Sequence, residues 1–240
     1  MRRSSVRISS APGALLAEFD EGRRLVMTSH GCYEPDEPLY EIVKQKLGPG
    51  LKVRMVEDSA VMPLAMGLTI AASIAGQLLF LRQGNGSCGT TLYMAILALN
   101  LLIHEAGHAA ALKMFLPEAR ITLGFRFMFV FPALYVNTTA SYLLPKGKRA
   151  AVHLAGVFAN ALGLVIGNLL IPGASSANAA IAWMMLLNLV PIMKGDGHQT
   201  LAALLEWHTP ALSKGRRAAQ ECARGVAMLT LVIALSRLVA

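Results

Sequence analysis

Long apolar runs alternate with short polar connections over most of the chain. Apolar runs cover about 59–81, 91–112, 150–171 and 179–193, and a shorter one covers 225–240. A helix needs about 20 apolar residues to cross the hydrocarbon core of a bilayer. We therefore predict an all-α polytopic membrane protein, a helical bundle with spans at these positions, of which the last two are short.

The first 58 residues follow a different pattern and contain no run of this kind. Ala14–Phe19 and Arg24–Thr28 flank an Asp-Glu-Gly sequence, which is typical of a hairpin with a glycine turn. Glu37–Leu47 places its apolar residues on one helical face. These features predict a small α+β cytosolic module at 1–58, followed by a membrane-embedded domain at 59–240.

A β pattern interrupts the polar connection between the second and third apolar runs. Apolar residues recur there at every second position, which indicates a strand or hairpin: Ile121, Leu123, Phe125, Phe127, Phe129 and Phe131. Pro132 ends the strand or marks it as an edge strand. The phenylalanine face either packs on neighbouring helices or belongs to a membrane-associated edge strand, where Phe125, Phe127 and Phe129 accompany an extended substrate. The two interpretations are compatible.

Composition supports a membrane protein over a nucleic-acid-binding one. Apolar residues make up 55% of the chain and charged residues 15%, which is too apolar for an ordinary soluble fold. The net charge is +8, but the basic residues flank the apolar runs and form no stripe with interleaved aromatic residues. We expect the lipid bilayer as a partner, and no nucleic acid.

The distribution of lysine and arginine predicts the orientation. Segments 1–58, 113–149 and 194–224 hold nine, six and five of them, whereas 82–90 and 172–178 hold one and none. Because positively charged connections stay inside, we predict a multi-pass protein of the cell membrane with a cytoplasmic N-terminus. The second and fourth spans then run in the same direction, and both end on the cytoplasmic side.

The second apolar run contains His104, Glu105 and His108. Histidines four residues apart lie on one helical face and can bind one metal ion, and Glu105 is placed to act as general base toward a zinc-activated water. Ionisable groups at bilayer depth are costly and usually functional. Zinc suits the set, because two imidazoles and one carboxylate leave a position open, as catalytic zinc requires.

Asp196 is the best candidate for the third ligand. It follows Pro191, which ends the fourth apolar run, and glycines on both sides free the backbone to turn the carboxylate inward. His198 is a rival ligand, and a surface position in a cytosolic turn is the alternative for Asp196.

Three motifs in order resemble the site-2 protease family of intramembrane zinc metalloproteases (peptidase M50-like). They are His104-Glu105-Ala106-Gly107-His108, Gly156-Val157-Phe158-Ala159-Asn160, and Asn188-x-x-Pro191-x-x-x-x-Asp196-Gly197. The resemblance covers about 91–200.

The resemblance implies a three-helix catalytic core that holds one Zn²⁺ per chain. Zinc would be held by His104, His108 and Asp196, with Glu105 as general base. It further implies that Asn160 lies near the site and steadies the oxyanion or the substrate backbone. Membrane-associated strands after the first motif are also a feature of this family.

These observations predict a zinc-dependent metalloendopeptidase that cleaves a membrane-spanning or membrane-associated polypeptide, with the mouth of the active site facing the cytoplasm. Either a regulatory protein or a small peptide precursor could be the substrate. The alternative is a membrane zinc-binding or transport protein without proteolytic activity. The interior of the first run offers only Thr69, Ser73 and Gln77 for a conduit, and none of them is a good zinc ligand.

Overall fold

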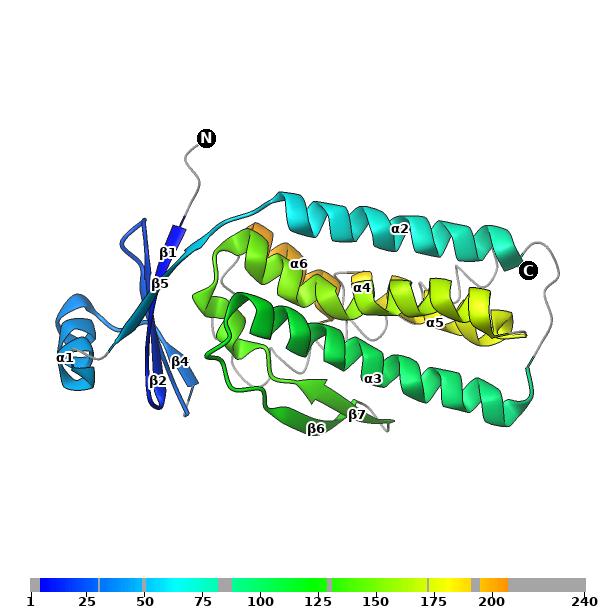
Figure 1. The fold of residues 1–240 in the computed structure, drawn as a ribbon, viewed down its shortest axis with the longest axis horizontal. Coiled ribbons are helices and arrows are strands. Elements are labelled where there is room, and N and C mark those ends of the chain that lie inside the picture. The colour runs from blue at the N-terminus through cyan, green and yellow to red at the C-terminus, as the bar shows by residue number, and fades with distance from the viewer. Residues whose placement is uncertain are drawn as a thin grey trace, which may run out of the picture.

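The computed structural model describes residues 5–29, 31–48, 51–81, 88–128, 131–171, 173–190 and 195–206. A five-stranded sheet with one helix comes first along the chain, and helices with a two-stranded sheet follow it (Figure 1). In chain order the elements are β1 (Ser5–Ala11), β2 (Ala14–Phe19), β3 (Arg24–Thr28), β4 (Gly31–Tyr33), α1 (Glu37–Leu47), β5 (Lys52–Glu57), α2 (Val61–Leu81), α3 (Thr90–Phe115), β6 (Leu123–Met128), β7 (Phe131–Val136), the 3₁₀ helix η1 (Thr139–Leu143), α4 (Lys146–Leu170), α5 (Ser175–Leu189) and α6 (Asp196–Leu204).

The N-terminal sheet is antiparallel, in the order β4-β3-β2-β1-β5. Its strands alternate between two buried faces, as period-two patterning requires. Leu16 and Val26 pair across β2 and β3 and pack with Tyr40 of α1 on one face. Val6 and Ile8 of β1 belong to the other face, which joins the core of the helices. The predicted β2–β3 hairpin and the helix α1 are confirmed.

The prediction of an all-α protein is wrong in the strict sense. Beyond the predicted hairpin, β1 and β5 pair with each other and extend the sheet. Both strands lie in polar sequence, and the isolated apolar positions of β1, such as Val6 and Ile8, do not by themselves predict a strand. The rest of the described chain is mainly helical.

Helices occupy the four predicted spans that the structure describes. α4 begins at Lys146 rather than Ala150, and α5 begins at Ser175 rather than Ala179. By length and composition, α2, α3 and α4 are long and apolar enough to cross a membrane, whereas α5 has 15 residues. The predicted fifth span, 225–240, lies outside the described residues.

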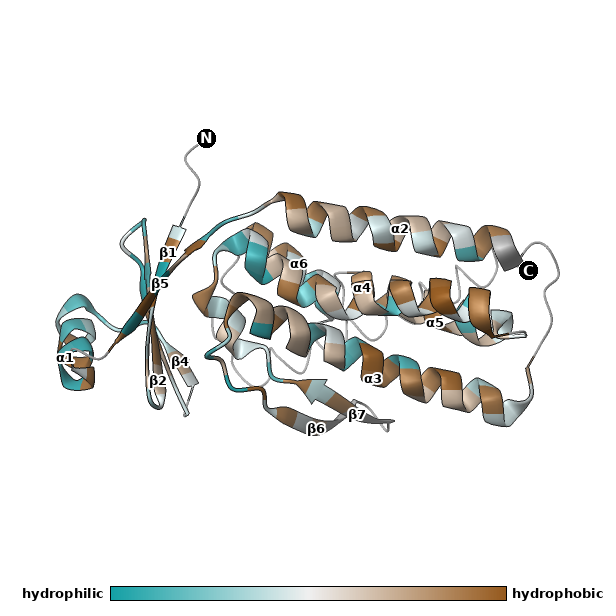
Figure 2. Ribbon diagram, in the orientation of Figure 1, coloured by the Kyte–Doolittle hydropathy of each residue, from teal (hydrophilic) through white to brown (hydrophobic). Residues whose placement is uncertain are grey.

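α4 is the central helix and packs against α2, α3, α5 and α6 (Figure 1). α2 and α4 run away from the N-terminal sheet, while α3 and α5 run back toward it, as their connections require. α3 and α5, the second and fourth predicted spans, therefore share a direction. Figure 2 shows apolar residues along the helices and hydrophilic ones on α1 and on the end of α4 beside the sheet.

β6 and β7 form an antiparallel hairpin, and β7 lies against α3 (Figure 1). Of the predicted strand or hairpin, the hairpin is confirmed, because β6 ends at Met128 and Phe131 begins β7. Pro132 stands inside β7, opposite Phe127, and does not end the ladder. A two-stranded sheet has an edge on both strands, which accommodates a residue without a backbone N–H.

Asp58 connects the sheet to the start of α4. Its Oδ1 accepts hydrogen bonds from the backbone N–H groups of Ser59 (2.9 Å) and Gly147 (2.8 Å). The second bond satisfies one of the free N–H groups at the N-terminus of α4. A Cβ at Gly147 would lie 2.6 Å from Asp58 Oδ1, so only glycine fits there. The N-terminal module therefore helps to position α4.

Candidate metal centre

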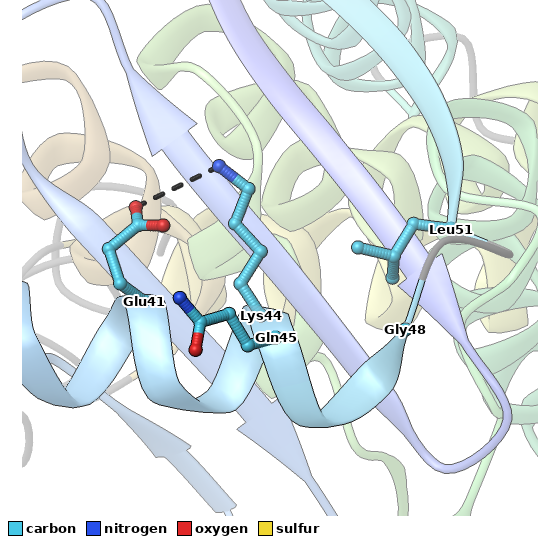
Figure 3. Close-up of a pocket in the computed structure, with 5 residues that line it drawn as sticks. All are labelled: Glu41, Lys44, Gln45, Gly48 and Leu51. Atoms are coloured by element: carbon cyan, nitrogen blue, oxygen red, sulfur yellow. Dashed lines mark ion pairs between the residues drawn. The ribbon is translucent and has the colours of Figure 1, made fainter.

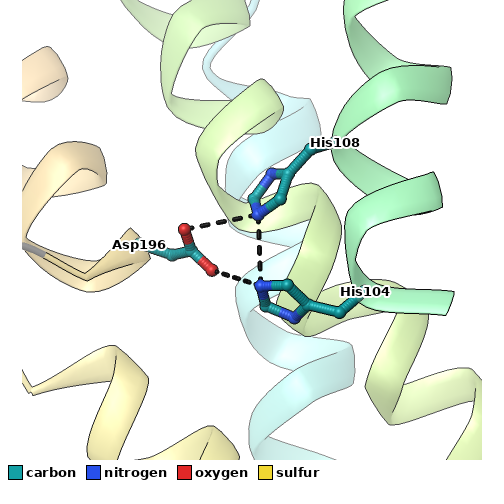
Figure 4. A group of neighbouring side chains, drawn as sticks. All are labelled: His104, His108 and Asp196. Atoms are coloured by element: carbon teal, nitrogen blue, oxygen red, sulfur yellow. Dashed lines mark hydrogen bonds and ion pairs between the residues drawn. The ribbon is translucent and has the colours of Figure 1, made fainter. Parts of the chain in front are cut away.

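His104, His108 and Asp196 converge in the structure (Figure 4). The two histidines project from consecutive turns of α3, and Asp196 stands at the start of α6. His104 Nε2 lies 3.2 Å from His108 Nε2 and 3.0 Å from Asp196 Oδ2, and His108 Nε2 lies 3.3 Å from Asp196 Oδ1. Zinc bonds of about 2.0–2.1 Å in a tetrahedral arrangement separate the ligand atoms by about 3.3 Å. The donor set and its spacing fit zinc.

α4 provides the opposite wall of this cluster. The Nδ1 of His108 is 2.8 Å from the backbone carbonyl of Val152, to which it donates. The Nδ1 of His104 is 3.0 Å from Nδ2 of Asn160. Gly156 lies midway between these contacts, and a Cβ there would stand 2.7 Å from the His104 ring and closer still to His108 Nε2. The G-x-x-x-N motif thus leaves room for the imidazoles and contacts one of them.

A second glycine allows α3 and α4 to approach each other. A Cβ at Gly107 would lie 2.5 Å from the carbonyl oxygen of Ala155 and 2.8 Å from the Cβ of Ala159. Because Gly107 has no side chain, α3 and α4 lie close enough for His104 to contact Asn160 and for His108 to contact Val152.

Asn188, at the end of α5, holds Asp196 in place. Its Nδ2 donates to Asp196 Oδ2 at 2.6 Å, and its Oδ1 accepts from the backbone N–H of Asp196 at 3.0 Å. Burial alone raises the pKa of the Asp196 carboxyl, but its close contacts with His104 and His108 outweigh burial and hold that pKa well below its usual range. The carboxylate is therefore anionic, as a metal ligand must be.

The glycines beside Asp196 act differently from the prediction. Neither Gly195 nor Gly197 has a positive φ, so they do not provide an unusual backbone conformation. A Cβ on Gly195 would collide with Asn188, and one on Gly197 with the backbone of Leu189. They permit the start of α6 to lie directly against the end of α5.

Glu105 contacts the hairpin in this structure. Its Oε2 accepts a hydrogen bond of 2.6 Å from the backbone N–H of Val136, the last residue of β7. Glu105 stands between the two histidines in the sequence, and its side chain is partly exposed. β7 therefore orients the predicted general base.

Other predicted residues lie apart from the cluster or outside the described chain. His198 lies in α6 and is not one of the three side chains that converge. Phe125 is 58% exposed, and its predicted role beside a substrate strand stays a prediction. The structure describes the backbone of Phe127 only, and Phe129 lies outside the described residues, as does Pro191.

A pocket on the N-terminal module lies on a different element from the cluster. It opens beside α1 and the chain that leads into β5, and its lining includes a Lys44–Glu41 ion pair of 3.8 Å (Figure 3). None of its lining residues contacts the histidines, which belong to α3.

Sequence reasoning missed several contacts that hold the cluster. Asn188 belongs to the third motif, and its position eight residues before Asp196 is the sequence feature that could have indicated the hydrogen bond between them. The carbonyl of Val152 and the N–H of Val136 gave no signal, because every residue has these backbone groups.

The comparisons with known proteins agree with the resemblance seen in the motifs. The chain is 36% identical over 114 residues to the "Putative peptide zinc metalloprotease protein YydH" of Bacillus subtilis (strain 168). The match covers 45% of this chain and 45% of that protein, so the chain spans less than half the length of this relative. No family model matches the chain, and no solved structure matches it with significance.

Proposed function

We propose that this protein is a membrane-embedded zinc metalloprotease of the site-2 type, which hydrolyses a peptide bond in a membrane-associated polypeptide. The observation that carries the proposal is the convergence of His104, His108 and Asp196, with Glu105 on the same helix as the histidines. The relative described as a zinc metalloprotease supports the same chemistry.

His104, His108 and Asp196 would hold the zinc ion, which supplies a Lewis acid that polarises the scissile carbonyl and acidifies a water. Glu105 takes one proton from the attacking water as its oxygen bonds to the carbonyl carbon. The same carboxyl then delivers that proton to the nitrogen as the C–N bond breaks. The immediate products are a carboxylic acid and an amine, the acid proton then passes to the amine to give a carboxylate and an ammonium group, and Glu105 returns to its ionised form.

The hairpin offers a backbone edge beside Glu105. Asn137 N–H bonds to the carbonyl of Thr122 on the β6 side, whereas Val136 N–H bonds to Glu105 on the opposite side. Because successive backbone groups of a strand point to opposite edges, Leu134 shares the edge of Val136. A substrate unwound from its own helical hydrogen bonds could pair with this edge of β7 and pass Glu105. The edge on β7 thus suits a substrate strand better than β6, which carries Phe125 and Phe127.

The amides of Gln77, Asn168 and Asn178, which lie on α2, α4 and α5, give no support to a zinc conduit. Asn168 Nδ2 donates to Gln77 Oε1 and Asn178 Nδ2 donates to Asn168 Oδ1, each at 2.6 Å. Gln77 Nε2 also donates to the carbonyl of Ser175 at 3.3 Å. These groups are bonded to one another, and amides are weak ligands for zinc.

The experiment compares wild type with Glu105→Gln, and Glu118→Gln serves as a control on an exposed carboxylate just after α3. Polypeptides that co-purify with Glu105→Gln from membranes are identified and then added to each purified, zinc-loaded protein. Wild type and Glu118→Gln should cleave one of them, and a chelator should stop the cleavage. Glu105→Gln should bind one zinc without cleaving. Cleavage by zinc-loaded Glu105→Gln would refute the role of Glu105, and a wild type that binds no zinc would refute the proposal as a whole.

A further inference from the structure

Within the described part of the chain, Asn160 has one buried polar atom without a partner. The residue is 7% exposed, and its Oδ1 makes no hydrogen bond among the residues the structure describes. Its Nδ2 instead faces Nδ1 of His104 at 3.0 Å. A buried acceptor without a donor costs about 1–3 kcal/mol, so this arrangement needs an explanation.

The facing nitrogens restrict the proton on His104. An amide nitrogen only donates, so Nδ1 would have to accept and the ring proton would have to sit on Nε2. Nε2 is the atom that points at His108 and Asp196. With a proton there, His104 has no lone pair for a metal ion.

Exchanging the two ends of the Asn160 amide removes both problems. The amide oxygen and nitrogen have nearly the same shape, and which is which is assigned from their hydrogen bonds. After the exchange, Oδ1 accepts the Nδ1–H of His104. The orphan acceptor is then satisfied, and the lone pair of His104 Nε2 points toward the cluster.

His108 already has this arrangement. Its Nδ1 donates to the carbonyl of Val152 at 2.8 Å, which leaves Nε2 directed at Asp196. Val152 and Asn160 are about two helical turns apart on α4, and Gly156 lies halfway between them. One face of α4 thus presents the carbonyl of Val152 as an acceptor, the space at Gly156 for the imidazoles, and Oδ1 of Asn160 as a second acceptor.

We infer that Asn160 is a positioning residue whose Oδ1 fixes the tautomer and orientation of His104. This inference rests on the proposed zinc site and assigns Asn160 to the metal rather than to the oxyanion or the substrate. Partners that orient a ligating histidine typically change metal affinity 10–100-fold when they are lost. An oxyanion group would instead affect catalysis and leave zinc affinity unchanged.

The test measures zinc affinity by competition with a chromophoric chelator for wild type, Asn160→Leu and Asn160→Asp. Asn160→Leu removes the acceptor at similar volume and should weaken zinc binding about 10–100-fold. Asn160→Asp keeps an acceptor and should restore affinity to within about threefold of wild type, because a carboxylate is a common partner of ligating histidines. The visible spectrum of the Co²⁺-substituted protein should change in Asn160→Leu and be close to wild type in Asn160→Asp.

Asn168→Leu is the matched control, because it removes a half-buried, hydrogen-bonded amide from the same helix away from the histidines. It should lower thermal stability and leave zinc affinity unchanged. Wild-type zinc affinity in Asn160→Leu would overturn the inference and leave the proposed function intact. Weak zinc binding by Asn160→Asp, equal to that of Asn160→Leu, would also overturn it, since the acceptor would then not matter. A wild-type protein that binds no zinc would refute both this inference and the proposed function.

Discussion

Gly156→Ala tests the fit of α4 to the metal centre with a single methyl group. The added Cβ would stand 2.7 Å from both Cε1 and Nε2 of His104 and closer still to Nε2 of His108. Ordinary non-bonded contacts between such atoms are about 3.5 Å or longer. The two imidazoles therefore have to move back by about 0.8 Å, whereas a zinc site tolerates deviations of about 0.2 Å in its bonds.

The displacement reaches two of the three ligands at once. We expect Gly156→Ala to weaken zinc binding at least about 100-fold, or about 2.8 kcal/mol at 1.4 kcal/mol per factor of ten. The metal-free fold should change less. Alanine gains about 1 kcal/mol over glycine in a helix, and overpacking costs about 1–3 kcal/mol.

Zinc affinity is measured by chelator competition in detergent, and thermal unfolding is followed with and without zinc. Gly163→Ala is the control on the same helix, because its Cβ would lie 3.7 Å from Asn100 Nδ2 and 3.9 Å from Ile103 Cδ1, which are ordinary contacts. It should bind zinc as wild type does. If Gly156→Ala also binds zinc within about threefold of wild type, the space at Gly156 does not determine the positions of the two imidazoles.

Two further predictions concern the contacts that hold the cluster and α4. Asn188→Ala removes both hydrogen bonds to Asp196 and should weaken zinc binding about 10–100-fold, measured by the same competition; an unchanged affinity would show that Asp196 needs no support. Asp58→Ala leaves the buried N–H of Gly147 without its acceptor and should lower stability by about 1–3 kcal/mol in thermal unfolding. Asp58→Asn should recover part of that loss, since Oδ1 still accepts, and equal losses in the two variants would contradict the capping role.

The helices were predictable because lipid-facing helices have to be apolar along their length. The runs at 59–81 and 91–112 correspond to α2 and α3 within a few residues. α4 begins earlier than its apolar run, at Lys146, because its first turn lies beside the sheet and tolerates charge. α6 was interpreted as a polar connection, since Asp196–Leu204 is short and contains a glycine and a histidine.

The strands were harder to predict because their partners are distant in sequence. β2 and β3 are joined by a short turn, and the sequence shows that turn directly. β5 pairs with β1 across more than 40 residues, and no local pattern specifies such a pairing. The hairpin β6–β7 was predicted as one strand or a hairpin, since the alternation continues through residues 129–130, which lie outside the described chain.

The three converging ligands were predictable from spacing and from motifs, but the contacts that orient them were not. A four-residue spacing puts His104 and His108 on one helical face wherever the helix lies. The orientation of each ring depends on α4, whose register against α3 is set by the close approach at Gly107. A sequence shows that Gly107 is small, but it does not show that Ala155 packs against it.

Asn160 and Asn168 are two asparagines of one helix whose side chains have different kinds of partner. Both are buried or half-buried amides of α4, and in a bilayer a polar side chain is expected to bond across helices. Asn168 meets this expectation with bonds to Gln77 and Asn178, so packing alone accounts for it. Among the described residues Oδ1 of Asn160 has no hydrogen-bond partner, and Nδ2 faces Nδ1 of His104, so packing does not account for Asn160. The contact is explained once His104 carries its proton on Nδ1, which is the state that a metal on Nε2 imposes. The contact of Asn160 with His104 therefore follows from the proposed zinc site, whereas the bonds of Asn168 need no metal.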